Sequence, residues 1–550
     1  MKKILLVAPK FESLSPCWEL HTIPFIRKKA FIVPLHLATL AALTPGDIEV
    51  DIWDEFVHGR IQEETCFSKE YDLVGITSNS TTIRRARDIA AVFRKQGIPA
   101  AVGGVGISTA PQQYRDDFDI LFIGEAELTW PRFIEDFLAS RCEKEYRQDS
   151  YPAMSLSPPP RWDSIALGMK DTYLLGGVQT TRGCPFNCEF CSSWQFSGRQ
   201  MRLKPIRQVL DEIATLEGLG MEQILLCVDN FFGKPGYSKT LLKELIPLNN
   251  SFAKPLRFRT EISINIARDD EMLALLADAN FNGLFIGIES PNKKSLEETK
   301  KVQNLYGDLL EDCRKIMSYG LPIEGSMIVG FDHDTPDIFQ QQFEFLQEAC
   351  IPVPKMHLLK ANPGTDLWER LLREGRLVED GKQDKAESIS AYVNPRATTN
   401  IIPKGMTRLE LLSGYLDLVE KIYDWDNFAA RLMGFVSLVN GKSAAVSIPG
   451  SPDGPPPGFK DFLDSLDEKA RSVIFKIFSH ARQQAPAMMQ IVLILIIRQY
   501  MEAADLPAFR GDLLKQIRLE ESRRRKSTGN FINYHGTGKH KDHKIAKKIP

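Results

Sequence analysis

Cysteine is scarce in this sequence, and most of it is scattered. The chain has nine cysteines in 550 residues, which is an odd number. Isolated cysteines do not form the paired framework of a disulfide-rich secreted protein, so that class is excluded and we expect a reducing, cytoplasmic location. The cysteines without a close neighbour are Cys17, Cys66, Cys142, Cys227, Cys313 and Cys350.

An excess of one charge and a long apolar run are also missing. Lysine and arginine number 69 against 71 acidic residues, so bulk charge favours no nucleic-acid partner. The longest apolar run, 491–497, is far below the roughly 20 residues of a membrane-spanning helix, so we expect no transmembrane segment. The start "MKKILLVAPK" has two lysines like a signal peptide, but its short apolar run leads into a strand–helix pattern and predicts a first strand.

Residues 1–150 alternate short apolar strands with helical stretches. Five runs rich in Val, Ile and Leu end near Gly, Pro, Ser or an acid, as buried parallel strands do. Residues 81–97 form a helix whose apolar face carries Ile83, Ala86, Ala90 and Phe93. This alternation predicts an α/β, Rossmann-like, doubly wound sheet. The five runs are "KKILLVAP", "IEVDIWD", "YDLVGITS", "IPAAVGGV" and "FDILFIGE".

The rest of the chain divides into four further segments. Residues 151–172 contain three consecutive prolines and predict a linker. Residues 173–380 repeat the strand–helix unit six times, which predicts a partial (βα)6 barrel. We expect 381–520 to be a mostly helical region and the basic tail 521–550, which lacks periodicity, to be disordered.

Three cysteines stand together in "TTRGCPFNCEFCSSW", directly after the first predicted barrel strand. Cys184, Cys188 and Cys191 therefore lie at the C-terminal mouth, where barrel sites are built. Thiolates suit zinc or iron–sulfur clusters. A structural zinc site wants four ligands, and no second Cys or His pair lies nearby in the sequence, so the spacing favours an iron–sulfur cluster with one open iron. The alternatives are a zinc site and a chance grouping of cysteines that bind no metal.

The Cys-x3-Cys-x2-Cys loop, with Phe190 before its last cysteine, resembles that of the radical S-adenosylmethionine (SAM) superfamily. The resemblance implies that Cys184, Cys188 and Cys191 hold a 4Fe–4S cluster whose free iron chelates SAM. An electron from the cluster would cleave SAM to a 5'-deoxyadenosyl radical, while the protein positions the reactants and excludes water.

Later strand ends resemble the superfamily less closely. The Gly-Gly-Glu pattern of many members is absent, and "VDN" at 228–230 stands in its place. Each carboxylate has an alternative role as an ion pair at the barrel rim, and Gly330 is placed where the backbone would approach adenine. The residues that the resemblance implies for SAM binding are Phe190, Asp229, Asn230, Glu261, Ser263, Glu289 and Gly330.

A doubly wound domain ahead of such a barrel is similar to the cobalamin (B12)-binding domain of one radical SAM class. The matching motifs are "VPLHLATLAAL", "GGVGISTAP" and "FIGEAELTWP". The Asp-x-His-x-x-Gly motif that ligates cobalt elsewhere is absent, and His21, His36 and His58 do not fit it, so we expect no histidine ligand to cobalt. The residues that should lie near the cobalamin crevice are Thr77, Ser78, Gly103, Gly104, Gly124 and Glu125.

The C-terminal segments "LLKANPGTDLWERLLREGRL" and "TTNIIPKGMTRLELLSGYLDLVEKIYDWDNF" resemble the module of the subfamily that includes the hopanoid C-2 methylase. The likeness implies a methyltransferase that methylates an unactivated carbon through the 5'-deoxyadenosyl radical and methylcobalamin. A radical SAM oxidative cyclase or ring-rearranging enzyme, and a non-catalytic cobalamin or redox sensor, remain alternatives. The implied partners are a small-molecule or lipid substrate and an electron donor such as flavodoxin or ferredoxin.

Overall fold

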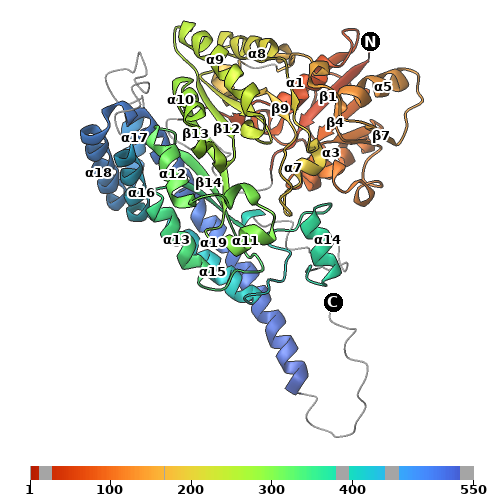
Figure 1. Cartoon of the computed structure of the whole chain (residues 1–550). Coiled ribbons are helices and arrows are strands. Elements are labelled where there is room, and N and C mark those ends of the chain that lie inside the picture. The colour runs from red at the N-terminus through yellow and green to blue at the C-terminus, as the bar shows by residue number, and fades with distance from the viewer. Residues whose placement is uncertain are drawn as a thin grey trace.

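The computed structural model describes residues 2–11, 26, 28–165, 168–378, 395–439 and 458–532. Two parallel sheets and a helical C-terminal region make up the fold, as the sequence predicts (Figure 1). Cys17, His21, most of the predicted tail and the segment 379–394 lie outside the described residues.

The first sheet has six parallel strands in the order β3-β1-β4-β5-β6-β7. The five predicted strands take the flavodoxin-like doubly wound order, in which a ligand crevice opens where the order reverses, here between β1 and β4. The sixth strand, β7, has only three residues and was not predicted. The strands are β1 (Lys3–Ala8), β3 (Glu49–Asp54), β4 (Leu73–Thr77), β5 (Ala100–Gly103), β6 (Ile120–Ile123) and β7 (Glu145–Arg147).

Helices cover both faces of this sheet because its strands are apolar on both sides. Leu5 and Val7 point to one apolar cluster and Ile4 and Leu6 to another. The predicted face of α3 packs against the Leu5 side through Ala86, Ala90 and Phe93, which are all fully buried. The helices are α1 (Leu35–Ala42), α2 (Glu55–His58), α3 (Ile83–Lys95), α4 (Val105–Ser108) and α5 (Ala126–Leu138).

The second sheet is the partial barrel, with parallel strands in the order β15-β14-β13-β12-β11-β8-β2. Six of them are the predicted strands. The seventh, β2 (Ala30–Ile32), comes from the N-terminal segment and pairs with β8, so the expected boundary at residue 150 does not separate the two sheets. The six are β8 (Tyr173–Gln179), β11 (Gln223–Cys227), β12 (Arg257–Glu261), β13 (Phe281–Glu289), β14 (Ile323–Val329) and β15 (Val353–Leu358).

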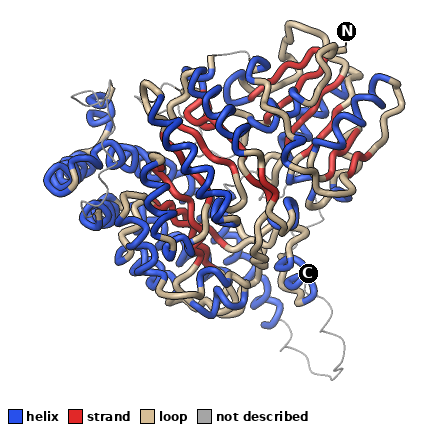
Figure 2. The backbone as a smooth tube through the Cα atoms, turned by 45° about the horizontal axis from the view of Figure 1, so that its top comes forward, coloured by secondary structure: helices blue, strands red, loops and turns tan. Residues whose placement is uncertain are grey.

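Helices lie along the outside of the barrel sheet (Figure 2). On β12, Phe258 and Thr260 are buried, whereas Arg257, Arg259 and Glu261 alternate with them and keep partial exposure. Because side chains alternate across a strand, the second set faces the barrel interior. The helices are α8 (Ile206–Gly218), α9 (Pro235–Ser251), α10 (Asp270–Asp278), α11 (Lys293–Glu298), α12 (Leu309–Ser318) and α13 (Ile338–Glu348).

The C-terminal region is helical, as predicted. A capping box between Thr407 and Glu410 begins α15. The helices are α14 (Asp366–Arg373), α15 (Arg408–Tyr423), α16 (Trp425–Leu438), α17 (Phe459–Ser465), α18 (Glu468–Gln484) and α19 (Met489–Ile532). The last helix continues to Ile532, so the expectation of disorder from residue 521 is wrong for 521–532.

Helix α19 is a structural element of the barrel. The helical segment Pro486–Arg524 is long and apolar enough to cross a membrane by length and composition, and 44% of its most apolar window is buried. Its Met501 packs against Phe31 of β2 and Leu174 of β8, and its Glu502 pairs with Lys355 of β15. Contacts with strands from both edges of the sheet indicate that α19 closes the open side of the partial barrel.

Candidate active site

The three-cysteine loop follows β8 and leads into the short helix α7 (Ser193–Ser197). Cys188 is 6% exposed, and Cys184 and Cys191 are partly exposed. Burial raises the pKa of Cys184 to about 11, and the neighbouring Cys191 and Cys188 raise it further. This mutual electrostatic effect places the three thiols close to one another. The Gln303 side chain also lies against Cys188, with Nε2 3.6 Å from Sγ.

Segments distant in sequence hold this loop at the barrel mouth. The amide of Glu189 donates to Thr299 O at 2.9 Å, and its carbonyl accepts from Leu367 N of α14 at 3.0 Å. Asp229, which follows β11, accepts from Gly183 N at 2.8 Å. Asp229 therefore fixes the entrance of the loop. Sequence reasoning placed this carboxylate near the SAM amino group and missed the loop contact.

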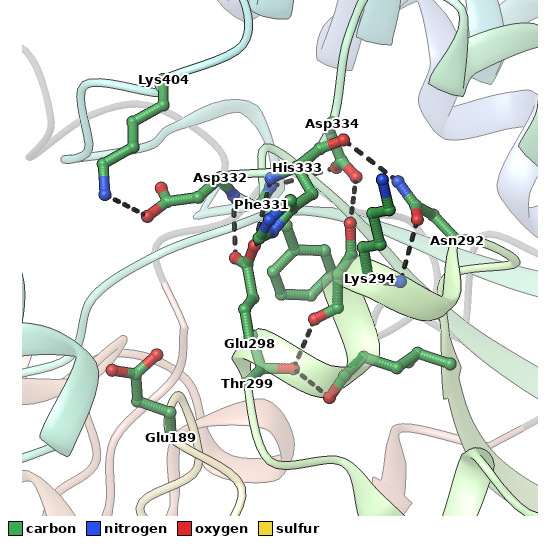
Figure 3. A network of polar contacts seen from close by, with 12 residues as sticks. Glu189, Asn292, Lys294, Glu298, Thr299, Phe331, Asp332, His333, Asp334 and Lys404 are labelled. Carbon is green, nitrogen blue, oxygen red and sulfur yellow. Dashed lines mark hydrogen bonds and ion pairs between the residues drawn. The ribbon is translucent and has the colours of Figure 1, made fainter.

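A polar network joins α11 to the turn after β14, and Glu189 of the cysteine loop lies near it (Figure 3). Glu298 of α11 accepts from Asp332 N at 2.8 Å, and Lys404 pairs with the Asp332 carboxylate at 3.1 Å. Arg370 of α14 bridges Asp332 at 2.7 Å and Glu189 at 2.6 Å. The C-terminal helices therefore support the loop that carries the cysteines.

A buried ion pair lies beside the cysteines. Lys301 Nζ is 2.7 Å from Glu289 Oε1, and both residues are almost fully buried. Lys301 also lies 6.0 Å from the centre of the Phe190 ring, and its charge acts on Cys188 and Cys191. Glu289 adopts a φ of 65°, an unusual backbone conformation for this residue. The sequence predicted Glu289 as a site residue, but it did not identify its partner Lys301, which lies in the segment "KKVQN".

Two predicted SAM residues from neighbouring strand ends meet directly. Asn230 Nδ2 donates to Ser263 Oγ at 3.1 Å, and Ser263 in turn contacts Asn265 Oδ1 at 2.6 Å. Close by at the end of β12, burial raises the pKa of Glu261 to about 7. The rim of β11 and β12 thus offers amide and hydroxyl groups together with a carboxyl group that is easily protonated.

Gly330 has a local structural explanation. Its φ is +110°, its amide donates to Asp334 Oδ2 at 2.9 Å, and a Cβ there would lie 3.2 Å from Leu411 of α15. A positive φ and this close packing are enough to explain why residue 330 is a glycine, even if no ligand approaches it. The predicted approach to adenine is therefore not needed to explain this residue.

At the carboxyl ends of the first sheet, glycine permits two loops to touch. Gly104 has a φ of +108°, and a Cβ there would lie 2.3 Å from Ser78 O. Ser78 N donates to Gly103 O at 2.8 Å, while Thr77 ends β4 and lies opposite Gly103. Four predicted cobalamin residues thus form one tightly packed cradle of backbone at the carboxyl ends of β4 and β5.

A cavity of about 300 Å³ opens at Gly124, where the first sheet meets the cysteine loop. Part of its wall comes from the first sheet and part from Gln195 and Phe196 of α7. The two halves of the molecule therefore share one surface beside the cysteines. The lining residues are Ser108, Thr109, Ile123, Gly124, Arg147, Gln148, Tyr151, Gln195, Phe196 and Gly364.

Glu125, which the sequence places near the cobalamin crevice, forms buried ion pairs with two arginines. Arg182 Nη1 donates to its Oε2 at 2.6 Å, and Arg202 Nη1 donates to the same oxygen at 2.7 Å. Arg182 also binds Glu127 at 2.6 Å. These contacts occupy the carboxylate that sequence reasoning assigned to cobalamin. They also attach the first sheet to Arg182, which lies two residues before Cys184.

His36 is the second residue of α1. Its side chain is exposed, yet desolvation lowers its pKa to about 4. The adjacent Leu35 contacts the barrel sheet, since a Cβ at Gly177 would lie 3.5 Å from Leu35 Cβ and 3.6 Å from Cys227 Sγ. The start of α1 therefore lies against the barrel sheet.

The donor set fits an iron–sulfur cubane better than one metal ion. Within the described ranges, no three His, Cys, Asp or Glu side chains are grouped as ligands of a single ion. A cubane binds each thiolate on a separate iron, so its cysteines stand further apart than the ligands of one ion. The three cysteines on one short loop supply three thiolates for such a cluster, and the Lys301 cation lies beside them.

The radical SAM superfamily matches residues 178–346, and a domain of unknown function matches 365–453. An uncharacterized methyltransferase of Synechocystis is 31% identical over 78% of this chain and 77% of its own length. The hopanoid C-2 methylase of Rhodopseudomonas palustris is 30% identical over 70% and 72%. The chain belongs to the radical SAM superfamily and is an enzyme of that superfamily. Within it, the chain belongs to the group that contains the hopanoid C-2 methylase, as its C-terminal motifs predicted.

Solved structures support the same fold. The radical SAM methyltransferase TsrM of Kitasatospora setae, solved with tryptophan and a SAM analogue, superposes with a TM-score of 0.60. It covers 88% of this chain and 100% of its own at 15% identity. The cobalamin-dependent SAM radical enzyme OxsB, solved with aqua-cobalamin, gives 0.57 over 94% of this chain and 81% of its own at 14% identity. The arrangement of sheet, barrel and helical region is thus confirmed.

Proposed function

We propose that the protein is a cobalamin-dependent radical SAM methyltransferase that methylates an unactivated carbon of a small molecule. The observation that carries this proposal is the meeting of the cysteine loop with the carboxyl ends of the first sheet, through Arg182, Glu125 and the cavity at Gly124. A methyl donor on the sheet and a radical source on the barrel would then face one space. The methyltransferase names of the relatives support this reaction.

The cysteine loop and the barrel rim have the groups that the radical chemistry needs. A 4Fe–4S cluster bound by Cys184, Cys188 and Cys191 would supply the electron that cleaves SAM into methionine and the 5'-deoxyadenosyl radical. Lys301 stabilises negative charge beside Cys188 and holds Glu289 in place. Asn230 and Ser263 present hydrogen-bonding groups that suit the polar parts of SAM.

The first sheet has the groups that suit cobalamin, which would supply the methyl group. Ser78, Gly103 and Gly104 hold the loops after β4 and β5 in close contact at the carboxyl ends of the strands, where doubly wound sheets bind their ligands. We keep the expectation that no histidine ligates cobalt, because no described histidine belongs to the required motif.

The substrate, the electron source and the location complete the proposal. A substrate at the barrel mouth would be shielded from water by α15 and α19, which lie against β15 of the barrel (Figure 1). A flavodoxin or ferredoxin would deliver single electrons. Every cysteine in the described residues is a free thiol, which agrees with a cytoplasmic enzyme.

The test uses the full chain purified without oxygen and reconstituted with iron and sulfide. With SAM and a reductant, the wild type should release 5'-deoxyadenosine, and Cys191→Ala should not. Cys350→Ala is the matched control, because this thiol lies on the far side of the fold against Gly434 of α16. Equal 5'-deoxyadenosine from the wild type and Cys191→Ala would overturn the radical reaction.

A second measurement separates methylation from cyclisation or rearrangement. SAM labelled in its methyl group should pass the label to product when cobalamin is present, and not when it is omitted. Cleavage of SAM with no label in any product would instead favour a radical cyclase.

A further inference from the structure

Four buried charged side chains join the cysteine loop to the first sheet. Two of them, Glu125 and Glu127, lie at the start of α5, and the other two, Arg182 and Arg202, lie on either side of the cysteine loop. The carboxylate side chains are each 3% exposed, and those of Arg182 and Arg202 are 14% and 12% exposed. These ion pairs are therefore largely shielded from water, where charge-assisted hydrogen bonds hold their geometry best.

The two arginines hold both ends of the cysteine loop. Arg182 ends β9 (Thr181–Arg182) and Arg202 begins β10 (Arg202–Leu203), and the two residues lie opposite each other in the antiparallel pair. Arg202 Nη2 also donates to Ser197 O, at the end of α7, at 2.9 Å. All three cysteines lie between the two arginines, so the arginines mark the neck of the loop.

A single carboxylate binds both arginines. Arg182 Nη1 and Arg202 Nη1 donate to Oε2 of Glu125 at 2.6 Å and 2.7 Å, and Arg202 Nη2 pairs with its Oε1. Arg202 thus binds the carboxylate through two parallel contacts, a geometry that allows little movement. Glu125 follows Gly124, which comes directly after β6 and lines the cavity shared with α7. The carboxyl ends of the first sheet are therefore joined directly to the neck of the cysteine loop.

We propose that Glu125, Arg182 and Arg202 fix the distance between a cobalamin on the first sheet and the iron–sulfur cluster on the loop. The proposal rests on the proposed function, which places the methyl donor on the sheet and the radical source on the loop. Reacting atoms in a transfer step must approach to about 3–3.5 Å, and an error of about 1 Å can slow the step roughly a hundredfold. The three side chains act as positioning residues, because their charged groups already bind one another.

The test uses the full chain, purified without oxygen, reconstituted with iron and sulfide and loaded with hydroxocobalamin. After reduction, cobalt(II) and the reduced cluster each carry an unpaired electron, and pulsed electron paramagnetic resonance measures the distance between them. The wild type should give one narrow distribution of distances. We expect Glu125→Gln to widen it about twofold, because two buried arginines lose a shared partner and must move toward water. Arg202→Gln should widen it less, because Arg182 still binds Glu125.

Glu143→Gln is the matched control. Glu143 is 60% exposed and pairs with Arg132 of α5 at the surface, so the same substitution there should leave the distribution unchanged. Protein molecules that lack either cofactor contribute no dipolar signal. The distribution therefore describes only doubly loaded protein, even where a variant folds poorly or binds less iron.

Wild-type distributions in both Glu125→Gln and Arg202→Gln, or an equal change in Glu143→Gln, would overturn the positioning role and leave the proposed function intact. A wild type that binds no cobalamin, or one whose two bound cofactors show no dipolar coupling, would instead overturn the proposed function and the positioning role with it. The two failures are thus distinguishable, and the measurement needs no substrate.

Discussion

Arg370 and Glu189 are 181 positions apart in the chain, yet they form a two-pronged ion pair with Nε–Oε1 at 2.6 Å and Nη2–Oε2 at 3.0 Å. Glu189 lies between Cys188 and Cys191, and Arg370 belongs to α14, the helix that follows the last barrel strand, β15. The pair makes the cysteine loop, which follows the first of the six predicted barrel strands, depend on the last strand–helix unit.

Replacing Arg370 with Gln should destabilise the cysteine loop. Glu189 is 5% exposed, and breaking a buried pair by removing one partner costs about 3–5 kcal/mol. We expect a lower urea midpoint and less iron bound per chain. Arg373→Gln is the matched control, because Arg373 is exposed on the same helix. The double variant E189Q/R370Q should recover part of the loss, and an R370Q protein with wild-type iron content would contradict this role.

Lys301 should raise the reduction potential of a cluster bound at the loop. Its cation lies beside Cys188 and stabilises the more negative, reduced state. Lys301→Met should lower the midpoint by on the order of tens of millivolts, as expected for one charge at intermediate dielectric. The midpoint is measured by redox titration followed by electron paramagnetic resonance. The double variant Lys301→Met/Glu289→Gln removes one positive and one negative charge together. Its midpoint potential should therefore stay near that of the wild type. Equal midpoints in all three proteins would exclude the electrostatic role.

Gly104 and Glu125 should differ in their effect on cobalamin binding. Gly104→Ala forces a Cβ to within 2.3 Å of Ser78 O at a φ of +108°, so the cradle must shift. We expect at least tenfold weaker binding of hydroxocobalamin, followed by its absorbance change. Gly97→Ala is the control, since it also has a positive φ but nothing lies within 4 Å of its Cβ. Glu125→Gln should keep its cobalamin affinity while lowering stability. The opposite pattern, with only Glu125→Gln losing affinity, would restore the carboxylate to the binding site.

Local sequence patterns predicted both sheets because each strand carries its own apolar signal and each helix its own face, as Phe93 and Ala90 show on α3. The cysteine loop was predictable for the same reason, since its spacing is continuous in the chain. The ion pairs of Arg182, Lys301 and Arg370 were not predictable. Each joins residues from separate elements, and no local pattern distinguishes a surface cation from one that the fold turns inward.

The same limit applies to the two elements that complete the barrel. Strand β2 is only three residues long, too short for a periodic signal. The run 491–497 predicted a buried helix, but that α19 spans the open edge of the barrel is evident only from contacts such as Met501 with Leu174 and Glu502 with Lys355. Tertiary packing, which a single sequence does not display, decides both.

Glu261→Gln should stabilise the protein without cofactors in a pH-dependent way. Burial raises the pKa of Glu261 from 4.5 to about 7, so the folded state holds this proton more tightly than the unfolded state. The ionised carboxylate therefore costs nothing below about pH 4.5, an increasing amount between pH 4.5 and 7, and a constant amount above that, about 3 kcal/mol. Urea unfolding at pH 4.5 and pH 8 should show equal stability at the lower pH and a more stable variant at the higher. Glu244→Gln, an exposed carboxylate on α9, should show no such difference. If E261Q and the wild type differ by the same free energy of unfolding at both pH values, Glu261 is well solvated or stably paired. The rim of β12 would then lack a group that protonates near neutrality.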